Sequence, residues 1–368
     1  MSFVVMGFVD IVGVATGYIK HDFGLADNLA QLIPSMALFW FFVLSVPSGL
    51  LQDKFGKRRM LNIGMLLTGL GMVVPFVQYS FPSMLVAFVL LGIGNTIVQV
   101  SANPLLRDVS PWSRYSSYMS LSQFIKAIIS LIGPIVTTMM ASFFGNWKLV
   151  FAIYSITSIL AVIWLYFTKI EETRAEDKPA TFKSCFGLLK NRFILVMVIG
   201  IFVLVGADVG MNANIANFLQ TSFGLSLENA SLGISIYFMA LMIGRLSGAI
   251  ILNWVSSRKL LVITSVVALA SLVAMLLVPS LILARVAIFM VGLGSANLFP
   301  LIFSISVEKM PDRANEVSGL MIMAVSGGAF FPPVMGMVST HAGVSASFLV
   351  LIAGMIYLVG SGIFSLRS

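Results

Sequence analysis

The chain has 368 residues, of which 59% are hydrophobic and 10% charged, with a formal net charge of +8 and a pI near 9.7. Typical soluble domains carry about 25% charged residues, so a chain with a mean hydropathy of +1.02 cannot cover its surface with polar groups, which excludes a soluble globular protein. The one cysteine, Cys185, excludes an intrachain disulfide and a thiolate metal cluster. Both histidines, His21 and His341, fall in predicted loops, so we expect no metal site and no cofactor.

Apolar runs of about 20 residues are long enough to span a bilayer as helices. The sequence predicts an all-α polytopic membrane protein with twelve spans, at 3–19, 29–51, 60–79, 83–106, 115–142, 148–168, 193–220, 228–252, 260–278, 281–306, 314–339 and 344–365. The first run has no basic leader, so we expect it to be retained as a span.

The spans divide into two halves. We predict an N-terminal six-helix bundle at 1–168, a charged cytoplasmic linker at 169–192 and a C-terminal six-helix bundle at 193–368. The halves repeat, because Gly49 and Arg59 match Gly248 and Arg258 at an offset of 199 residues. Parallel repeats of this kind occur in transporters whose substrate site lies between the halves near the membrane midplane.

The positions of the basic residues predict the orientation. With the N-terminus inside, most of the 22 Lys and Arg residues fall in cytoplasmic segments, and we count Arg245 among them. We therefore expect both termini to lie in the cytoplasm. We also expect the protein to be a monomer embedded in the lipid bilayer of a bacterial inner (plasma) membrane. The basic pI then reflects topology, and we expect no nucleic-acid partner.

The segment "GLLQDKFGKRR" at 49–59 joins the second and third predicted helices. It resembles the G-x-x-x-D-(R/K)-x-G-x-(R/K)-(R/K) signature of the major facilitator superfamily. The matching residues, which the resemblance implies form a gating motif, are Gly49, Asp53, Lys54, Gly56, Arg58 and Arg59. A glycine at position 49 lets two helices approach closely, a glycine at 56 permits a tight turn, and an aspartate at 53 suits a helix N-terminus.

A narrower resemblance follows from "LGIGNTIVQVSANPLL" at 91–106, "VGADVGMNANIANFLQTSFG" at 205–224, "IGRLSG" at 243–248 and "SGLMIMAVSGGAFFPPVMG" at 318–336. These segments are similar to the fucose/glucose/galactose permease family. The resemblance implies import of a monosaccharide, such as glucose, galactose or fucose, by cation symport with alternating access. The chain differs from the proton-coupled fucose importers in three places. Gln99 replaces a glutamate and Ser295 replaces an asparagine. Asp10 lies one turn nearer the cytoplasm than the acid in the first helix of those importers, which aligns near Gly13.

Three ionisable residues lie deep in the predicted spans, namely Asp10, Lys126 and Asp208. An aspartate at the centre of a membrane helix costs roughly 2.5–3.5 kcal/mol, and such residues usually face a cavity or one another. We predict that Asp10 binds or releases the coupling cation, H⁺ or Na⁺, and that Lys126 modulates it; a static ion pair is the alternative. Asp208 is a second cation ligand, a substrate acceptor, or a cap on a helix break near Gly206 and Gly210.

Amide side chains are suited to sugar hydroxyls because they donate and accept at fixed angles. Asn95, Gln99 and Asn103 follow one another at intervals of four residues and form one stripe on a helix. With Gln123 and Asn212 they are the predicted substrate-binding residues. The alternative is that these amides join helices to one another.

Three other functions remain open. A drug or other small-molecule:proton antiporter of the same superfamily typically carries a glycine-rich run in its fifth helix, where this chain has Thr137 and Thr138. A membrane enzyme needs a carboxylate cluster or a His/Asp pair, which the sequence lacks, so we predict no catalytic residues. A channel needs no duplication. We also expect Gly133-Pro134 and Pro332-Pro333 to break helices five and eleven.

Overall fold

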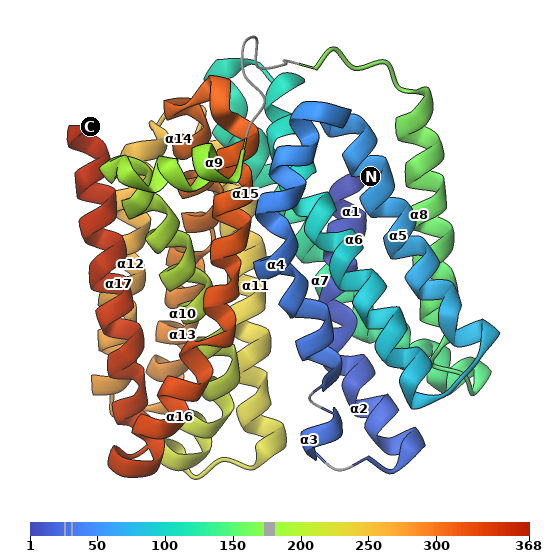
Figure 1. Cartoon of the computed structure of the whole chain (residues 1–368). Helices are drawn as coiled ribbons and strands as arrows, with labels where there is room; N and C mark the ends of the chain where they lie inside the picture. The colour runs from blue at the N-terminus through green and yellow to red at the C-terminus, as the bar shows by residue number, and fades with distance from the viewer. Residues whose placement is uncertain (26, 31, 173–180) are drawn as a thin grey trace. The chain divides into compact units, whose positions relative to one another are not determined.

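A computed structural model describes residues 1–25, 27–30, 32–172 and 181–368, and these residues form helices and connecting segments without a strand (Figure 1). Among the described residues, twelve helices are long and apolar enough to cross a membrane, which confirms the predicted number of spans. The helices of the first half are α1 (Ser2–Met6), η1 (Gly7–Ile11), α2 (Val12–Phe23), α3 (Asp27–Ala30), α4 (Leu32–Phe55), α5 (Lys57–Val77), α6 (Phe81–Asp108), η2 (Trp112–Arg114), α7 (Tyr115–Phe144) and α8 (Leu149–Phe167).

The remaining elements follow the charged linker, of which residues 173–180 lie outside the described part of the chain. They are α9 (Phe182–Gly187), η3 (Leu188–Lys190), α10 (Arg192–Phe223), α11 (Leu227–Ile251), α12 (Ser257–Leu277), α13 (Leu281–Ser295), α14 (Leu298–Lys309), η4 (Pro311–Arg313), α15 (Ala314–Met323), η5 (Ala324–Ala329), α16 (Phe331–Ala342) and α17 (Val344–Arg367).

Three of the spans are interrupted helices. The first changes to 3-10 geometry at η1, the tenth is divided between α13 and α14, and the eleventh changes to 3-10 geometry at η5 before α16 begins. The predicted break of helix eleven is confirmed, with proline in the first turn of α16. The predicted break of helix five is wrong, because α7 continues through Pro134.

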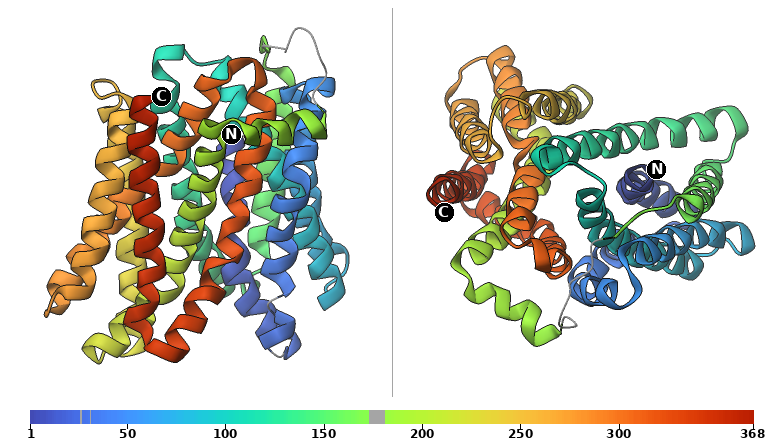
Figure 2. Two further views of the ribbon diagram at one scale, coloured as in Figure 1. Left: turned by 60° about the vertical axis from the view of Figure 1, so that its left-hand side comes forward. Right: turned by 90° about the horizontal axis from the view of Figure 1, so that it is seen from above.

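Contacts divide the chain into two compact units, and within each unit the long helices run side by side (Figures 1 and 2). The first unit contains Met1–Pro111, Ile125–Phe186 and Met310–Met323. The second contains Trp112–Phe124, Gly187–Lys309 and Ala324–Ser368. The starts of helices five and eleven are each grouped with the unit that contains most of the other predicted half.

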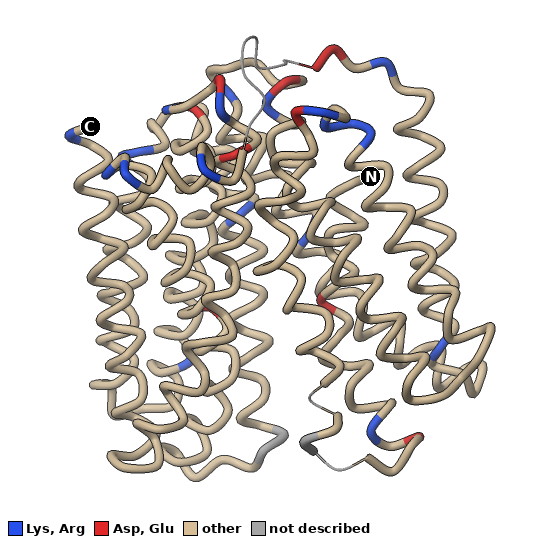
Figure 3. Tube along the Cα trace, in the orientation of Figure 1, with Lys and Arg blue, Asp and Glu red and all other residues tan. Residues whose placement is uncertain are grey.

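Basic side chains gather at one end of the helices. Figure 3 shows most Lys and Arg residues of the first unit at the end that carries the N-terminus, and most of those of the second unit at the end that carries the C-terminus. This segregation is what the positive-inside rule requires of a membrane protein.

Glycines allow close helix contacts within the first unit. Gly49 on α4 lies against α15, where a Cβ atom on Gly49 would come within 2.7 Å of the Asn315 carbonyl oxygen. Gly319 faces the same contact from α15, since its Cβ would lie 3.0 Å from the Ser45 carbonyl oxygen. Gly49 therefore has the packing role that the motif predicts, and its partner helix is the start of helix eleven.

We expect Gly49→Ala to lower the thermal stability of the purified protein, because the added methyl group meets the backbone of α15, and overpacking costs about 1–3 kcal/mol. Gly17→Ala is the matched control, since a Cβ on that helical glycine meets nothing within 4 Å. Melting curves in one detergent would compare the two variants. Equal melting temperatures for both variants would show that the contact does not hold the helices together.

Candidate functional site

The first unit places Asp10 at the middle of an interrupted helix. Asp10 lies in η1, and its carboxylate is exposed on the protein surface. The Ser130 hydroxyl on α7 donates a hydrogen bond to the Asp10 carboxylate and also lies 3.0 Å from the Lys126 carbonyl oxygen. Within the described residues no ion pair joins Asp10 to Lys126. Ser130 thus links the Asp10 carboxylate to the backbone of Lys126 and not to its side chain.

The predicted amide stripe runs along α6 and is buried. Asn95 is fully buried, and its Nδ2 donates to the Val5 and Met6 carbonyl oxygens at 3.3 and 3.1 Å. These carbonyls lie where α1 gives way to η1, so the regular helical hydrogen bonding changes there and Asn95 compensates for it. This contact supports the helix-joining alternative for Asn95.

The next amides of the stripe bond to one another. Gln99 Nε2 donates to Asn95 Oδ1 at 2.9 Å, and Asn103 Nδ2 donates to the Gln99 carbonyl oxygen at 3.0 Å. Gln99 is 5% exposed, and among the described residues its Oε1 accepts no hydrogen bond. The Gln99 side chain therefore retains an acceptor that a hydroxyl group can use.

The second unit holds Asp208 on α10, near the middle of its span. The hydroxyl of Tyr237, a residue of α11 that is 1% exposed, donates to Asp208 Oδ1 at 2.5 Å. Because α10 is continuous past Gly206 and Gly210, the prediction that Asp208 caps a helix break is wrong. Asn212 lies half-buried one turn further along α10.

Arg245 corrects the topology count. We predicted this arginine in a cytoplasmic segment, but it lies half-buried within α11. Its Nε donates to the Ala296 carbonyl oxygen, at the division between α13 and α14, and its Nη1 donates to the Gln123 carbonyl oxygen, each at 3.4 Å. Arg245 thus supports the interrupted tenth helix, together with Asn297, whose Nδ2 donates to the Gly244 carbonyl oxygen at 2.6 Å.

The structure therefore sorts the predicted residues into two groups. Asp10, Lys126, Asn95, Gln99 and Asn103 lie in the first unit, whereas Asp208, Gln123 and Asn212 lie in the second. Gln123 is 4% exposed, and its backbone carbonyl is what contacts Arg245. In the described part of the chain no group of three or more His, Cys, Asp or Glu side chains is suited to hold a metal ion.

Ser130, Tyr237 and Arg245 were not predicted as site residues from the sequence. Ser130 could have been found, because it follows Lys126 by four residues and so lies on the same helix face. Arg245 also carried a signal, since it falls inside the apolar run at 228–252. Tyr237 carried none, because a single tyrosine in an apolar helix does not show which helix it faces.

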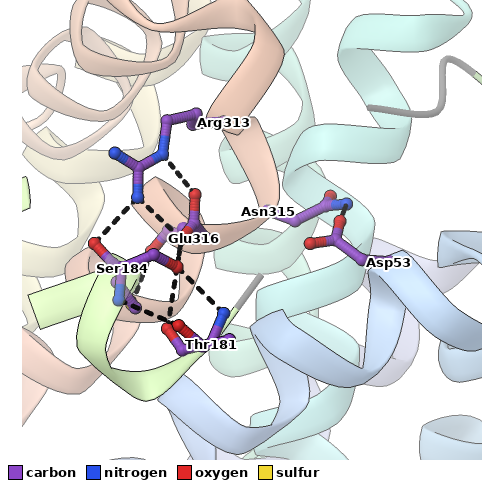
Figure 4. Close-up of polar contacts among 7 residues, drawn as sticks. Asp53, Thr181, Ser184, Arg313, Asn315 and Glu316 are labelled. Atoms are coloured by element: carbon purple, nitrogen blue, oxygen red, sulfur yellow. Dashed lines mark hydrogen bonds and ion pairs between the residues drawn. The ribbon is translucent and has the colours of Figure 1, made fainter. Parts of the chain in front are cut away.

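The gating motif makes contacts within the first unit. Gly56 has a φ of +86°, so it makes the turn that glycine permits. The Glu172 carboxylate accepts from the backbone N–H groups of Lys57 and Arg58, at 2.6 and 3.2 Å, at the N-terminus of α5. Asp53 accepts from Asn315 Nδ2 at 2.6 Å, close to the N-terminus of α15 (Figure 4).

The other cations of this loop differ in environment. Arg58 donates to the carbonyl oxygens of Leu165 and Tyr166 at the end of α8. Lys54 and Arg59 are exposed. Lys57, a variable position of the motif, forms an ion pair of 2.5 Å with Asp108, and the two side chains are 4% and 1% exposed.

We expect Lys57→Met to destabilise the protein by about 3–5 kcal/mol, because it leaves the Asp108 carboxylate buried without its cation. Adding Asp108→Leu to Lys57→Met should recover much of that loss. Thermal denaturation of the two single variants and the double variant would measure the coupling. Additive losses would contradict a buried pair.

Comparison with known proteins identifies the family. The model of the Major Facilitator Superfamily matches residues 1–333, and the chain belongs to this family. The glucose/galactose transporter of Brucella abortus biovar 1 (strain 9-941) is 24% identical over 384 residues, covering 100% of this chain and 93% of that protein. The fosmidomycin resistance protein of Escherichia coli (strain K12) is also 24% identical, covering 91% of this chain and 80% of that protein.

A solved structure supports the same fold. The crystal structure of FucP in the outward conformation, a transporter that is the E. coli fucose:proton symporter, superposes with a TM-score of 0.86 at 18% identity. The match covers 99% of this chain and 97% of FucP. The all-α membrane fold predicted from the sequence, and its resemblance to the fucose/glucose/galactose permeases, are confirmed.

Proposed function

We propose that this protein is a secondary active transporter that imports a monosaccharide by cation symport, through alternating access. The observation that carries the proposal is the exposed carboxylate of Asp10 at an interrupted membrane helix, in the same unit as a buried amide stripe. Transporters bind substrates and coupling ions near the midplane, typically at discontinuous helices. The substrate class, a hexose such as glucose or galactose, or fucose, follows from the names of the relatives.

Asp10 is the proposed coupling residue. A midspan aspartate costs roughly 2.5–3.5 kcal/mol, and one hydroxyl partner offsets only part of this. The cost is understandable if the carboxylate takes up H⁺ or Na⁺ once in each cycle. Lys126 lies one turn from Ser130, which bonds both the Asp10 carboxylate and the Lys126 backbone carbonyl, and we propose that the Lys126 side chain modulates Asp10 during the cycle. Asp208, with Tyr237, is the corresponding acid of the second unit.

The amides are proposed to recognise the sugar to different degrees. Asn95 is occupied with the backbone of helix one, so Gln99 is the residue of α6 that we assign to substrate contact. Asn103, Gln123 and Asn212 are further candidates. We also propose a bacterial inner-membrane location with both termini cytoplasmic and a monomeric state, on the distribution of basic residues and the family fold.

The second candidate function is a small-molecule:proton antiporter. The similarity to the fosmidomycin resistance protein favours it. The buried amide side chains favour a sugar, because polyhydroxylated substrates need several donors and acceptors in fixed positions. The coupling acid serves both functions, so transport measurements must separate them.

We expect purified protein in liposomes to accumulate labelled D-glucose above equilibrium under an inward gradient of either H⁺ or Na⁺, and not without a gradient. A symporter couples uphill sugar entry to downhill cation entry, so the effective gradient names the cation. Folded protein with no uptake under any gradient would reject glucose, and D-galactose and L-fucose would be tested next. Efflux of fosmidomycin that is driven by an inward H⁺ gradient would favour the antiporter.

We expect Asp10→Asn to abolish gradient-driven accumulation while sugar exchange across the membrane without a gradient persists, because the amide cannot take up a proton and lacks the charge that binds Na⁺. Asp312→Asn, at an exposed acid in η4, is the matched control and should accumulate sugar normally. Retained accumulation in Asp10→Asn would exclude Asp10 as the coupling group.

A further inference from the structure

The short helix α9, which follows the charged linker, is attached to the start of helix eleven. The Ser184 hydroxyl donates to Glu316 Oε1 at 2.6 Å, and Arg313 Nη2 donates to the Ser184 carbonyl oxygen at 2.8 Å (Figure 4). Arg313 also forms a bidentate ion pair with Glu316, in which Nε and Nη2 donate to the two carboxylate oxygens at 2.5 and 2.7 Å. The three residues make a closed set of charge-assisted hydrogen bonds, which are stronger than neutral ones.

The same few residues of helix eleven also touch the gating motif. Asn315, between Arg313 and Glu316, bonds Asp53 at 2.6 Å. The start of α15 therefore forms hydrogen bonds with two other helices of the first unit, with α4 through Asp53 and with α9 through Ser184 (Figure 4). The sequence predicted that Asp53 lies at a helix N-terminus, but it predicted neither that this helix is α15 nor the contact of α15 with α9.

Thr181 and Ser184 make α9 a self-supporting element. The Thr181 N–H donates to Ser184 Oγ at 2.9 Å, and the Ser184 N–H donates to Thr181 Oγ1 at 3.1 Å. This reciprocal arrangement has the form of a capping box. Ser184 thus holds the first turn of α9 and the attachment to Glu316 with one side chain.

Cys185 is covered by this attachment. The residue is fully buried, and its thiol donates to the Glu316 carbonyl oxygen at 3.6 Å. Burial, and secondarily the charge of Glu316, raises the pKa of the Cys185 thiol to about 12. Only the thiolate reacts readily with electrophiles, so the thiol is protected while α9 is docked. Because it is the one cysteine in 368 residues, it reports on this contact alone.

We propose that α9 is a reversible strap on the start of helix eleven, fastened by Ser184, Glu316 and Arg313. When the strap is fastened, α15 is held both by α4 and by α9; when it is released, α15 loses the contact with α9 and keeps its contacts with α4 and with α6, the latter through Ser318 and the Val100 carbonyl oxygen. If the proposed transport function holds, the start of helix eleven moves in alternating access, and the strap then sets how readily that movement begins. The strap itself requires no assumption about the substrate.

The test is the labelling rate of Cys185 in membranes containing the full chain, using N-ethylmaleimide at pH 7 and mass spectrometry. We expect slow but measurable labelling of the native protein and rapid labelling after denaturation, since a released thiol with a pKa of about 8.5 is on the order of 10³-fold more ionised. Ser184→Ala and Glu316→Gln should each accelerate labelling of the folded protein at least ~10-fold, by raising the open fraction.

Two controls define the background. Cys185→Ser should not label. Thr168→Ala, which removes a hydroxyl that bonds only its own helix backbone at 2.7 Å, should label like the native protein. Gel-filtration profiles would confirm that each variant is folded. Immediate labelling of the native chain would show that α9 is not docked, and no labelling over hours would show that it never opens.

Unchanged rates in both Ser184→Ala and Glu316→Gln would show that these contacts do not fasten α9, and any of these three results overturns the proposal. A separate failure of sugar uptake, with the labelling pattern intact, would reject only the transport proposal. The two conclusions are therefore measured independently.

Discussion

This structure depends on one constraint: a backbone N–H or C=O group inside a membrane cannot form a hydrogen bond with water and must find its partner within the protein. A continuous helix satisfies its own carbonyls, but an interrupted one does not. The first span changes geometry at Gly7, and Asn95 of α6 donates to two of the carbonyls at the change. The tenth span divides after Ser295, where Arg245 and Asn297 join the two sides to α11. These two interruptions are thus each supported by polar side chains that bond backbone carbonyls of a neighbouring helix.

This constraint changes how the polar residues of the spans should be interpreted. An amide in an apolar helix has two possible uses, to bind a substrate or to satisfy another helix, and sequence does not separate them. Asn95 serves the second use, whereas the Oε1 atom of Gln99, one turn away, accepts no hydrogen bond within the part of the chain that the structure describes. An interrupted helix needs polar side chains of other helices to bond its backbone groups. Only polar residues that do not make such bonds are available to a substrate.

The fold was accessible from sequence because its main determinant is hydropathy over about 20 residues, a signal that each span carries independently. The helix interruptions at η1 and between α13 and α14 were missed, because glycine and asparagine also occur in continuous membrane helices. The break at η5 was predicted because two prolines mark it. The break predicted at Pro134 was wrong, because in membrane helices neighbouring groups can bond the backbone carbonyl that a proline leaves without its partner. Asp10 and the amide stripe were found by their polarity, but their contacts with Ser130 and Val5 depend on how the helices pack, which residue spacing within one helix does not give.

The internal repeat gives the strongest reason to separate the roles of the two acids. Asp10 and Asp208 lie 198 residues apart, almost one repeat, yet their surroundings have diverged. Asp10 is exposed, in a 3-10 segment, beside a serine hydroxyl. Asp208 is half-buried in a continuous helix, against a tyrosine that is 1% exposed.

A coupling group must exchange its cation with water on each side of the membrane in turn, so access matters as much as charge. A carboxylate that is exposed in a 3-10 segment, as at Asp10, meets this requirement. A carboxylate fixed by a buried phenol in regular helix is better suited to hold a neighbouring helix or a substrate in place. The two acids thus lie at nearly matching positions of the predicted repeat, and the packing around each one supports the proposal that Asp10 is the coupling group and Asp208 a positioning group.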